Sequence, residues 1–163
     1  MNIKIDIERH KTVPVTQAQL AGLLTDVEAT LKKFPKLRKL NPLGEQDYRL
    51  DMQTIGSSVA KIAHDVSFGA RCSADRAKST LSWKPLPKVG NAQLEGQFQL
   101  AGEGKSTRLS LRVRGELNDV PVPLMYRLVA PAFIQGKFSA LIDAYLEKLA
   151  ATAGSGKFTQ ASA

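Results

Sequence analysis

The sequence predicts an α+β fold in which a curved antiparallel sheet of about seven strands wraps around one long C-terminal helix. Apolar and polar residues alternate along the first eight residues and again from about residue 36 to residue 117, which is the two-residue period of strands with one buried face. Apolar residues then return to helical spacing up to residue 149. This terminal helix is the only element long enough to cover the apolar face of such a sheet.

The N-terminal region predicts one strand followed by short helices. Three isoleucines within the first seven residues alternate with charged residues. Thr16 is placed to cap a helix and Gln19 to complete a capping box. Apolar residues follow at helical spacing, and we expect Gly22 to split the segment into two shorter helices. Pro35 ends it, because the residue before a proline is disfavoured in the α conformation.

The alternating region predicts an antiparallel meander with one solvated face. Short turns are expected at Gly90–Asn91 and at Gly102–Gly104. Residues 62–72 are expected to form one continuous strand, and residues 81–83 a shorter one. Glycines inside strands weaken pairing and often mark bends, which favours strong curvature: Gly69, Gly96 and Gly115.

The C-terminal helix is the longest predicted element. We expect Pro131 to kink it or to divide its first turns from the main body, and Gly154 to end it. One domain is therefore predicted over residues 1–153, with a flexible tail over residues 154–163. The apolar residues at helical spacing are Phe138, Leu141, Ile142, Tyr145, Leu146 and Leu149.

The composition is that of a globular protein, with 163 residues of which 43% are hydrophobic and 23% charged. A chain of this length can bury roughly 70% of the surface that its unfolded form exposes. The single cysteine excludes an internal disulfide, and no cysteine pair has metal-ligand spacing. Charges interrupt the N-terminal apolar residues, and no apolar run approaches a membrane span. We therefore expect a cytoplasmic protein without a cofactor.

The charge balance favours anionic partners, since 23 basic side chains against 15 acidic ones give a net charge of +8. One acid-free stretch of eight residues, interleaved with apolar side chains, would suit transient docking on anionic lipid headgroups; a solvated charged edge is the alternative. Nucleic-acid binding is not expected, because aromatic residues make up only 6% of the chain and few platforms for stacking exist. The basic residues of this cationic cluster are Lys32, Lys33, Lys36, Arg38 and Lys39.

Two combinations of residues resemble catalytic signatures and fail. His64 and Cys72 share a face of the strand expected over residues 62–72, but eight residues at about 3.3 Å each place them roughly 26 Å apart, far outside hydrogen-bond reach. Gly102–Ser106 resembles the end of a phosphate-binding loop, yet it leads into a strand instead of a helix. The sequence therefore assigns no catalytic residue.

The order of elements resembles that of the START-like (SRPBCC) superfamily, which includes Bet v 1-like proteins, polyketide cyclase/dehydrase-like proteins and coenzyme Q-binding proteins. The resemblance rests on the capped helical region after the first strand and on Pro121–Pro123 leading into the helix that ends at residues 141–149. It covers about residues 2–152. It implies a helix-grip fold with a hydrophobic cavity between sheet and helix, which serves lipids, polyketides, quinones and hormones across the family, and enzymes in a minority of members.

The predicted function is binding or carriage of an apolar small molecule, such as a lipid, quinone, polyketide or aromatic compound, without catalysis. One alternative is a cyclase, dehydratase or hydrolase acting in the same cavity through His64 or Tyr48; another is an adaptor with a filled core. A few polar tips among apolar side chains would orient a ligand, or would simply satisfy neighbouring groups. The expected cavity lining is Tyr48, His64, Val66, Phe68, Trp83, Phe98, Leu111, Phe138, Ile142 and Tyr145.

Overall fold

The computed structural model describes residues 1–57, 62–75 and 77–154. Seven strands form one sheet in the order β1-β9-β8-β7-β6-β3-β2, and its neighbouring strands run antiparallel. The strands of this sheet are β1 (Ile3–Val13), β2 (Leu37–Pro42), β3 (Asp47–Met52), β6 (Ser67–Asp75), β7 (Thr80–Gly90), β8 (Ala92–Glu103) and β9 (Ser106–Leu117). The fold class predicted from the sequence is confirmed.

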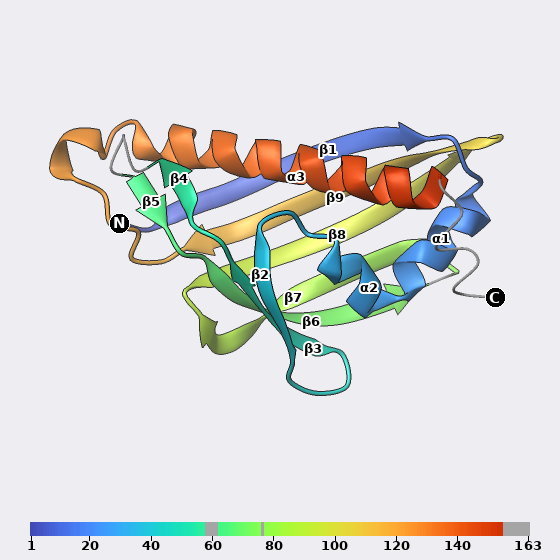
Figure 1. Ribbon diagram of the computed structural model, residues 1–163, viewed down its shortest axis with the longest axis horizontal. Coiled ribbons are helices and arrows are strands. Elements are labelled where there is room, and N and C mark those ends of the chain that lie inside the picture. The colour runs from blue at the N-terminus through green and yellow to red at the C-terminus, as the bar shows by residue number, and fades with distance from the viewer. Residues whose placement is uncertain (58–61, 76, 155–163) are drawn as a thin grey trace.

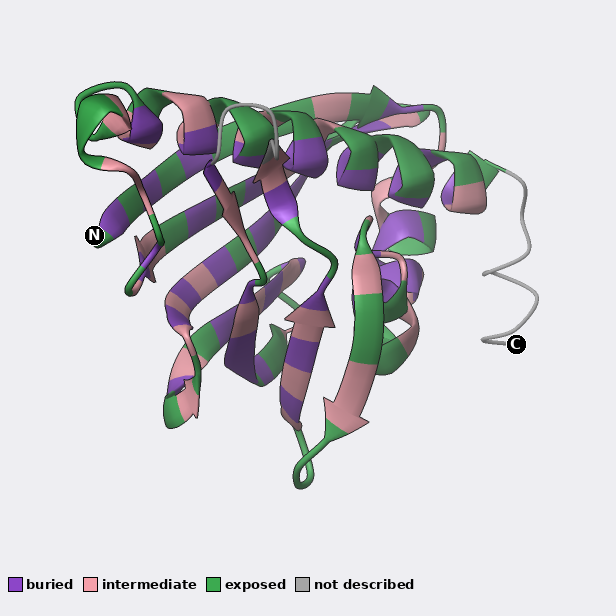
Figure 2. Ribbon diagram, turned by 60° about the vertical axis from the view of Figure 1, so that its left-hand side comes forward, coloured by how far each residue is buried: buried purple, intermediate pink, exposed green. Residues whose placement is uncertain are grey.

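The long helix α3 (Ala130–Gly154) lies along one face of the curved sheet, closest to β1 (Figure 1). The short helices α1 (Gln17–Thr25) and α2 (Val27–Lys32) follow β1 and lie toward the C-terminal end of α3. Bands of buried and exposed residues alternate along the strands (Figure 2), because successive strand side chains point to opposite faces. The sheet face toward α3 carries the core, and the other face meets solvent.

The helices begin where the sequence places them but divide elsewhere. The Thr16 side chain accepts the Gln19 backbone N–H, and the Gln19 side chain accepts the Thr16 N–H. The predicted capping box is therefore confirmed. The division falls at Asp26 and not at Gly22, because the Asp26 carboxylate caps the next helix by accepting the Ala29 N–H at 3.1 Å.

The expected continuous strand over residues 62–72 is wrong. The chain leaves the main sheet to form a separate hairpin of β4 (Ile55–Ser57) and β5 (Ile62–His64), then rejoins it at β6. The Asn91 side chain spans the break: its amide oxygen accepts the Ser67 N–H at 2.9 Å and its amide nitrogen donates to the Asp65 carbonyl at 2.7 Å. These bonds satisfy backbone groups that would otherwise lack a strand neighbour.

Strand β7 is longer than the predicted segment of residues 81–83. It continues through two prolines, Pro85 and Pro87, to Gly90. Its ladder with β8 covers only Thr80 to Trp83, and its ladder with β6 ends at Pro85. The prolines therefore lie where the strand has few partners, and their missing N–H groups cost little there.

The helix α3 begins where a kink was expected. Pro131 is its second residue, in the first turn, where the N–H groups have no intrahelical partner and the fixed φ of proline suits the helix. The predicted kink is therefore wrong, and the described part of α3 extends to Gly154. The tail predicted beyond it lies outside the described residues.

Candidate functional site

A chain of aromatic side chains fills much of the space between the sheet and α3. Phe34 connects two elements, since its ring centroid lies 4.5 Å from that of Tyr145 and 6.4 Å from that of Phe68. Phe98 continues the chain, with centroids 5.7 Å from Tyr145 and 6.2 Å from Trp83. Four of these residues belong to the predicted cavity lining, and Phe34 completes the chain from the end of α2.

The polar groups of the aromatic residues Tyr145 and Trp83 form hydrogen bonds with backbone carbonyls of the protein. The Tyr145 hydroxyl donates to the Thr30 carbonyl at 2.6 Å, and the Trp83 indole N–H donates to the Leu94 carbonyl at 3.0 Å. Burial raises the pKa of Tyr145 well above its usual value, so this phenol stays protonated as a donor. Each of these two hydrogen bonds connects one secondary-structure element to another.

Nine of the ten predicted lining residues are buried in the core, whereas His64 lies in the β4–β5 hairpin and lines a polar surface depression with Asp65 and Asp119. Burial also raises the pKa of Tyr48 above its usual value, which keeps that phenol neutral. His64 is half-buried, and the remaining nine residues are buried: Tyr48, Val66, Phe68, Trp83, Phe98, Leu111, Phe138, Ile142 and Tyr145.

His64 is the predicted residue with unused hydrogen-bonding capacity. Its Nε2 atom is buried and has no hydrogen-bond partner among the described residues, which is a costly arrangement for a polar atom. Burial lowers the pKa of the imidazole below its usual 6.5, opposed by the negative charge of Asp65. The neutral ring therefore dominates at neutral pH. His64 stands directly opposite Ile55 in the β4–β5 hairpin.

An apolar groove opens beside α3, with a volume of about 250 Å³. Three parts of the chain line it: α3, the turn between α2 and β2, and the hairpin strand β4. Ala140 and Ala144 are small residues one helical turn apart, which leaves room over the helix. The lining residues are Pro35, Lys36, Ile55, Lys137, Ala140, Leu141 and Ala144.

Two lysines mark the edges of this apolar groove. Lys36 and Lys137 are both exposed, and the Lys137 ammonium lies 5.4 Å from the centroid of the Phe133 ring. Neither lysine forms an ion pair within the described part of the chain. An apolar site with two uncompensated cations at its edge is suited to a molecule with an apolar body and an anionic group.

The cationic cluster predicted at residues 32–39 is mostly exposed. Lys32 forms an ion pair with Glu28 at 3.5 Å, one helical turn away, while Lys36 reaches the groove. Lys33 is half-buried, and the remaining cations of the cluster meet solvent: Lys32, Lys36, Arg38 and Lys39.

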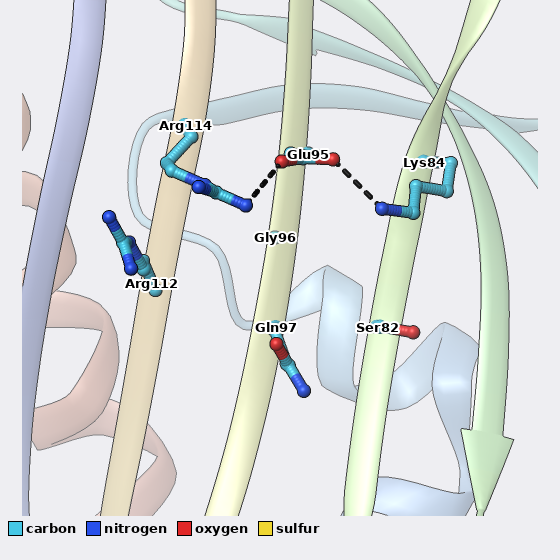
Figure 3. A pocket seen from close by; sticks show the side chains of 7 residues that line it. All are labelled: Ser82, Lys84, Glu95, Gly96, Gln97, Arg112 and Arg114. Atoms are coloured by element: carbon cyan, nitrogen blue, oxygen red, sulfur yellow. Dashed lines mark hydrogen bonds and ion pairs between the residues drawn. The ribbon is translucent and has the colours of Figure 1, made fainter.

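The outer face of the sheet carries a polar depression of about 190 Å³ whose charges are already paired (Figure 3). Glu95 lies between Lys84 and Arg114, with an oxygen 2.9 Å from each. The hydrogen bond from Lys84 is the main reason that the pKa of Glu95 is lowered. Arg112 pairs with Asp6 at 3.3 Å. These pairs leave little charge free to recognise a ligand.

Cys72 is buried, and burial raises the pKa of its thiol to about 12. A thiol in that environment is a poor nucleophile, because the thiolate is the reactive form. Cys72 therefore packs as a small apolar side chain.

Most groove residues were not predicted as site residues from the sequence. Leu141 was placed on the buried face of the C-terminal helix, and Lys36 in the cationic cluster. The sequence feature that could have indicated the groove is the pair Ala140 and Ala144 beside Lys137. Two small residues one helical turn apart leave space above the helix surface. Nothing in the sequence indicated that Ile55 lines the groove, because the separate β4–β5 hairpin is what brings it close to α3.

Two comparisons with known proteins found nothing similar: no protein-family model matches this chain, and no curated protein matches it. Among the described residues no helix is long and apolar enough to cross a membrane.

Solved structures do resemble the chain along almost its whole length. The aromatase/cyclase Zhui from Streptomyces sp. R1128 aligns with a TM-score of 0.67 at 18% identity, over 94% of this chain and 95% of its own. A START superfamily protein from Mycobacterium smegmatis aligns at 0.58 and 18%, over 95% and 97%. Ara h 8.0201 aligns at 0.59 and 14%, over 93% and 99%.

The architecture and these likenesses show the fold: the chain has a helix-grip fold, similar to that of the aromatase/cyclase and of the START superfamily protein. The resemblance stated from the sequence is confirmed at the level of the fold. Fold alone does not determine function; the groove and its charges are what would select a ligand.

Proposed function

We propose that this protein binds an apolar small molecule beside α3, with the groove as its entrance and the predicted lining residues as its inner wall. The observation that carries the proposal is the groove itself, which is apolar except for its two lysines. Its lining residues Pro35 and Ala144 are the sequence neighbours of Phe34 and Tyr145 in the aromatic chain. Neighbours of the same fold include an aromatase/cyclase and a START superfamily protein. A groove of 250 Å³ is slightly smaller than typical ligand pockets of about 300–1,000 Å³.

The two lysines narrow the class of ligand. An apolar molecule with a carboxylate or phenolate would place its body against Ile55 and Leu141 and its charge near Lys36 and Lys137. A fatty acid and its methyl ester test this preference as a matched pair. We expect the acid to bind more tightly, and Lys36→Gln/Lys137→Gln to weaken binding of the acid while leaving the ester unchanged.

Filling the groove tests its role as the binding site. Ala140→Trp should reduce binding of a fatty acid or of an apolar fluorescent probe by at least roughly tenfold, because the indole occupies the space over the helix. Ala151→Trp is the matched control, since Ala151 is also exposed on α3 but does not line the groove. Equal binding by both variants would exclude the groove as the site.

The natural ligand can be sought directly. The protein is purified natively, extracted with organic solvent and analysed by mass spectrometry for a small molecule in stoichiometric amount. A defined lipid, quinone or polyketide supports carriage and names the cargo. A clean extract, together with no thermal shift across lipids and aromatic compounds, contradicts the proposal and favours an adaptor with a filled core.

His64 favours a second candidate, an enzyme of the cyclase or dehydratase type. Its unpartnered Nε2 and lowered pKa are properties of a neutral general base. Tyr48, the alternative acid or base, is a neutral phenol with different surroundings, near Glu28 and Cys72. His64→Ala should then abolish turnover while binding of the same compound persists. Turnover that survives in His64→Ala would remove this residue from the chemistry.

The cationic cluster supports transient contact with an anionic membrane surface as part of carriage. Each basic residue near such a surface contributes about 1 kcal/mol, and four of the five are exposed. Binding to anionic vesicles should fall steeply with salt in the wild type. Lys32→Gln/Arg38→Gln/Lys39→Gln should weaken it, and unchanged binding would assign these cations to a solvated edge.

A further inference from the structure

The segment between β9 and α3 exposes four large apolar side chains together. They follow Pro121–Pro123 and end where α3 begins, at one end of the molecule (Figure 1). Such a concentration is unusual, because the surface of a monomeric protein rarely exposes contiguous large apolar side chains without a partner. The residues of this apolar tip, with their exposed fractions, are Leu124 (81%), Met125 (80%), Leu128 (97%) and Val129 (56%).

The tip is an ordered turn. Residues 124–126 form a short 3-10 helix, η1 (Leu124–Tyr126). The Tyr126 N–H donates to the Pro123 carbonyl at 2.9 Å, and the Val129 N–H donates to the Tyr126 carbonyl at 3.1 Å. The backbone is therefore held while the apolar side chains project outward. Most residues of this segment are exposed (Figure 2).

The stretch of chain that carries the tip is cationic, although Asp65 and Asp119 lie beside Pro121 at its start. No acidic residue occurs between Val120 and Ile142, and the two charged residues there are Arg127 and Lys137. Arg127 is exposed and forms no ion pair with a described residue. Lys137 lies eight residues beyond Val129 on α3, about 12 Å along the helix axis. Lys36 and Lys137 both line the groove, so cations extend from the tip toward the groove.

We infer that the apolar tip inserts into the surface of an anionic lipid bilayer. Exposed apolar side chains are stabilised when they leave water. The boundary between lipid headgroups and acyl chains offers them an apolar environment. Arg127 can keep its charge at the headgroups while its neighbours enter the apolar layer. The absence of acidic residues from this stretch matches the negative charge of such a surface. The inference goes beyond headgroup attraction by the cationic cluster, and it does not depend on the groove binding a ligand.

Vesicle binding by the full-length protein tests the insertion. Vesicles of phosphatidylcholine mixed with phosphatidylserine are sedimented with wild type, with Leu124→Ser/Leu128→Ser, and with Leu43→Ser. Leu43 is an exposed leucine elsewhere, 52% exposed in the turn between β2 and β3. We expect the tip variant to lose at least roughly tenfold in partitioning, because two leucines no longer leave water, and Leu43→Ser to bind as wild type does. Vesicles of phosphatidylcholine alone should bind the wild type more weakly.

A second measurement reports insertion directly. Trp83 is only 2% exposed. In Leu128→Trp, a change in fluorescence on vesicles therefore reports the new tryptophan at the tip. We expect its emission to shift to the blue on anionic vesicles and to be quenched by brominated acyl chains, while salt has less effect on it than on the initial binding.

Three results would overturn the inference. The first is wild-type protein that stays in solution with anionic vesicles. The second is a tip variant that partitions like wild type while Lys32→Gln/Arg38→Gln/Lys39→Gln does not, since that pattern means charge attraction alone. The third is a dimer in solution that only the tip variant converts to a monomer, which would make a second copy of this chain the partner. A cooperative urea unfolding transition like that of the wild type, measured separately, shows that the tip variant is folded.

Discussion

Gly96 lies directly opposite Trp83 in the β7–β8 ladder, and the indole ring packs against it. A Cβ atom added at Gly96 would lie 2.1 Å from Cη2 of the Trp83 ring, and that indole is fixed by its bond to the Leu94 carbonyl. Gly96→Ala should therefore destabilise the protein by about 1–3 kcal/mol through overpacking. Gly22→Ala is the control, because nothing lies within 4 Å of its added Cβ and it should stabilise α1 by about 0.5–1 kcal/mol. Urea unfolding measures both, and equal effects would contradict the steric argument.

His64 connects the stability of the protein to pH. Its pKa is lowered by burial from the usual 6.5, so below that pH the unfolded state takes up a proton that the folded state resists. The free energy of unfolding should therefore fall as the pH drops through 6.5 toward the lower folded-state pKa. Urea unfolding at about pH 7.5 and about pH 5.5 should show a smaller loss for His64→Gln than for wild type. The same change at His10 is the matched control; equal losses in all three proteins would rule out a His64 contribution.

Tyr145 joins two elements, α3 and α2. Its hydroxyl donates to the Thr30 carbonyl at 2.6 Å from a fully buried ring. Tyr145→Phe should cost about 1 kcal/mol, because one buried hydrogen bond is lost while the carbonyl still accepts the Lys33 N–H at 3.2 Å. Tyr126→Phe, in η1, is the control and should change stability little. A neutral Tyr145→Phe would mean that packing alone holds α2 against α3.

Opening of the whole molecule should be visible at Cys72. The thiol is 5% exposed and its pKa is raised to about 12, so a disulfide reagent should label native protein slowly and unfolded protein at once. The labelling rate should rise along the urea unfolding curve. Fast labelling without denaturant would show that the sheet separates locally from α3, and that the interior opens more readily than its packing suggests.

The fold was determined largely by local signals in the sequence. Two-residue alternation fixed which side chains face α3, and the capping box at Thr16 fixed where α1 begins. Glycines near the predicted turns adopt positive φ, as at Gly90 and Gly104, conformations that glycine adopts without strain. These signals are reliable because each depends on neighbours within a few residues, so the free energy that selects the conformation is itself local.

Tertiary structure alone decided the candidate site. Phe34 closes the aromatic chain against Tyr145, and the groove needs Lys36, Ile55 and Ala140 together, from elements far apart in the chain. The break that frees the β4–β5 hairpin is stabilised by Asn91, some 26 residues from Asp65. Whether the space between sheet and helix is filled or open depends on how such distant side chains pack. Periodicity records which face is apolar, but it carries no information on the volume left between two apolar faces.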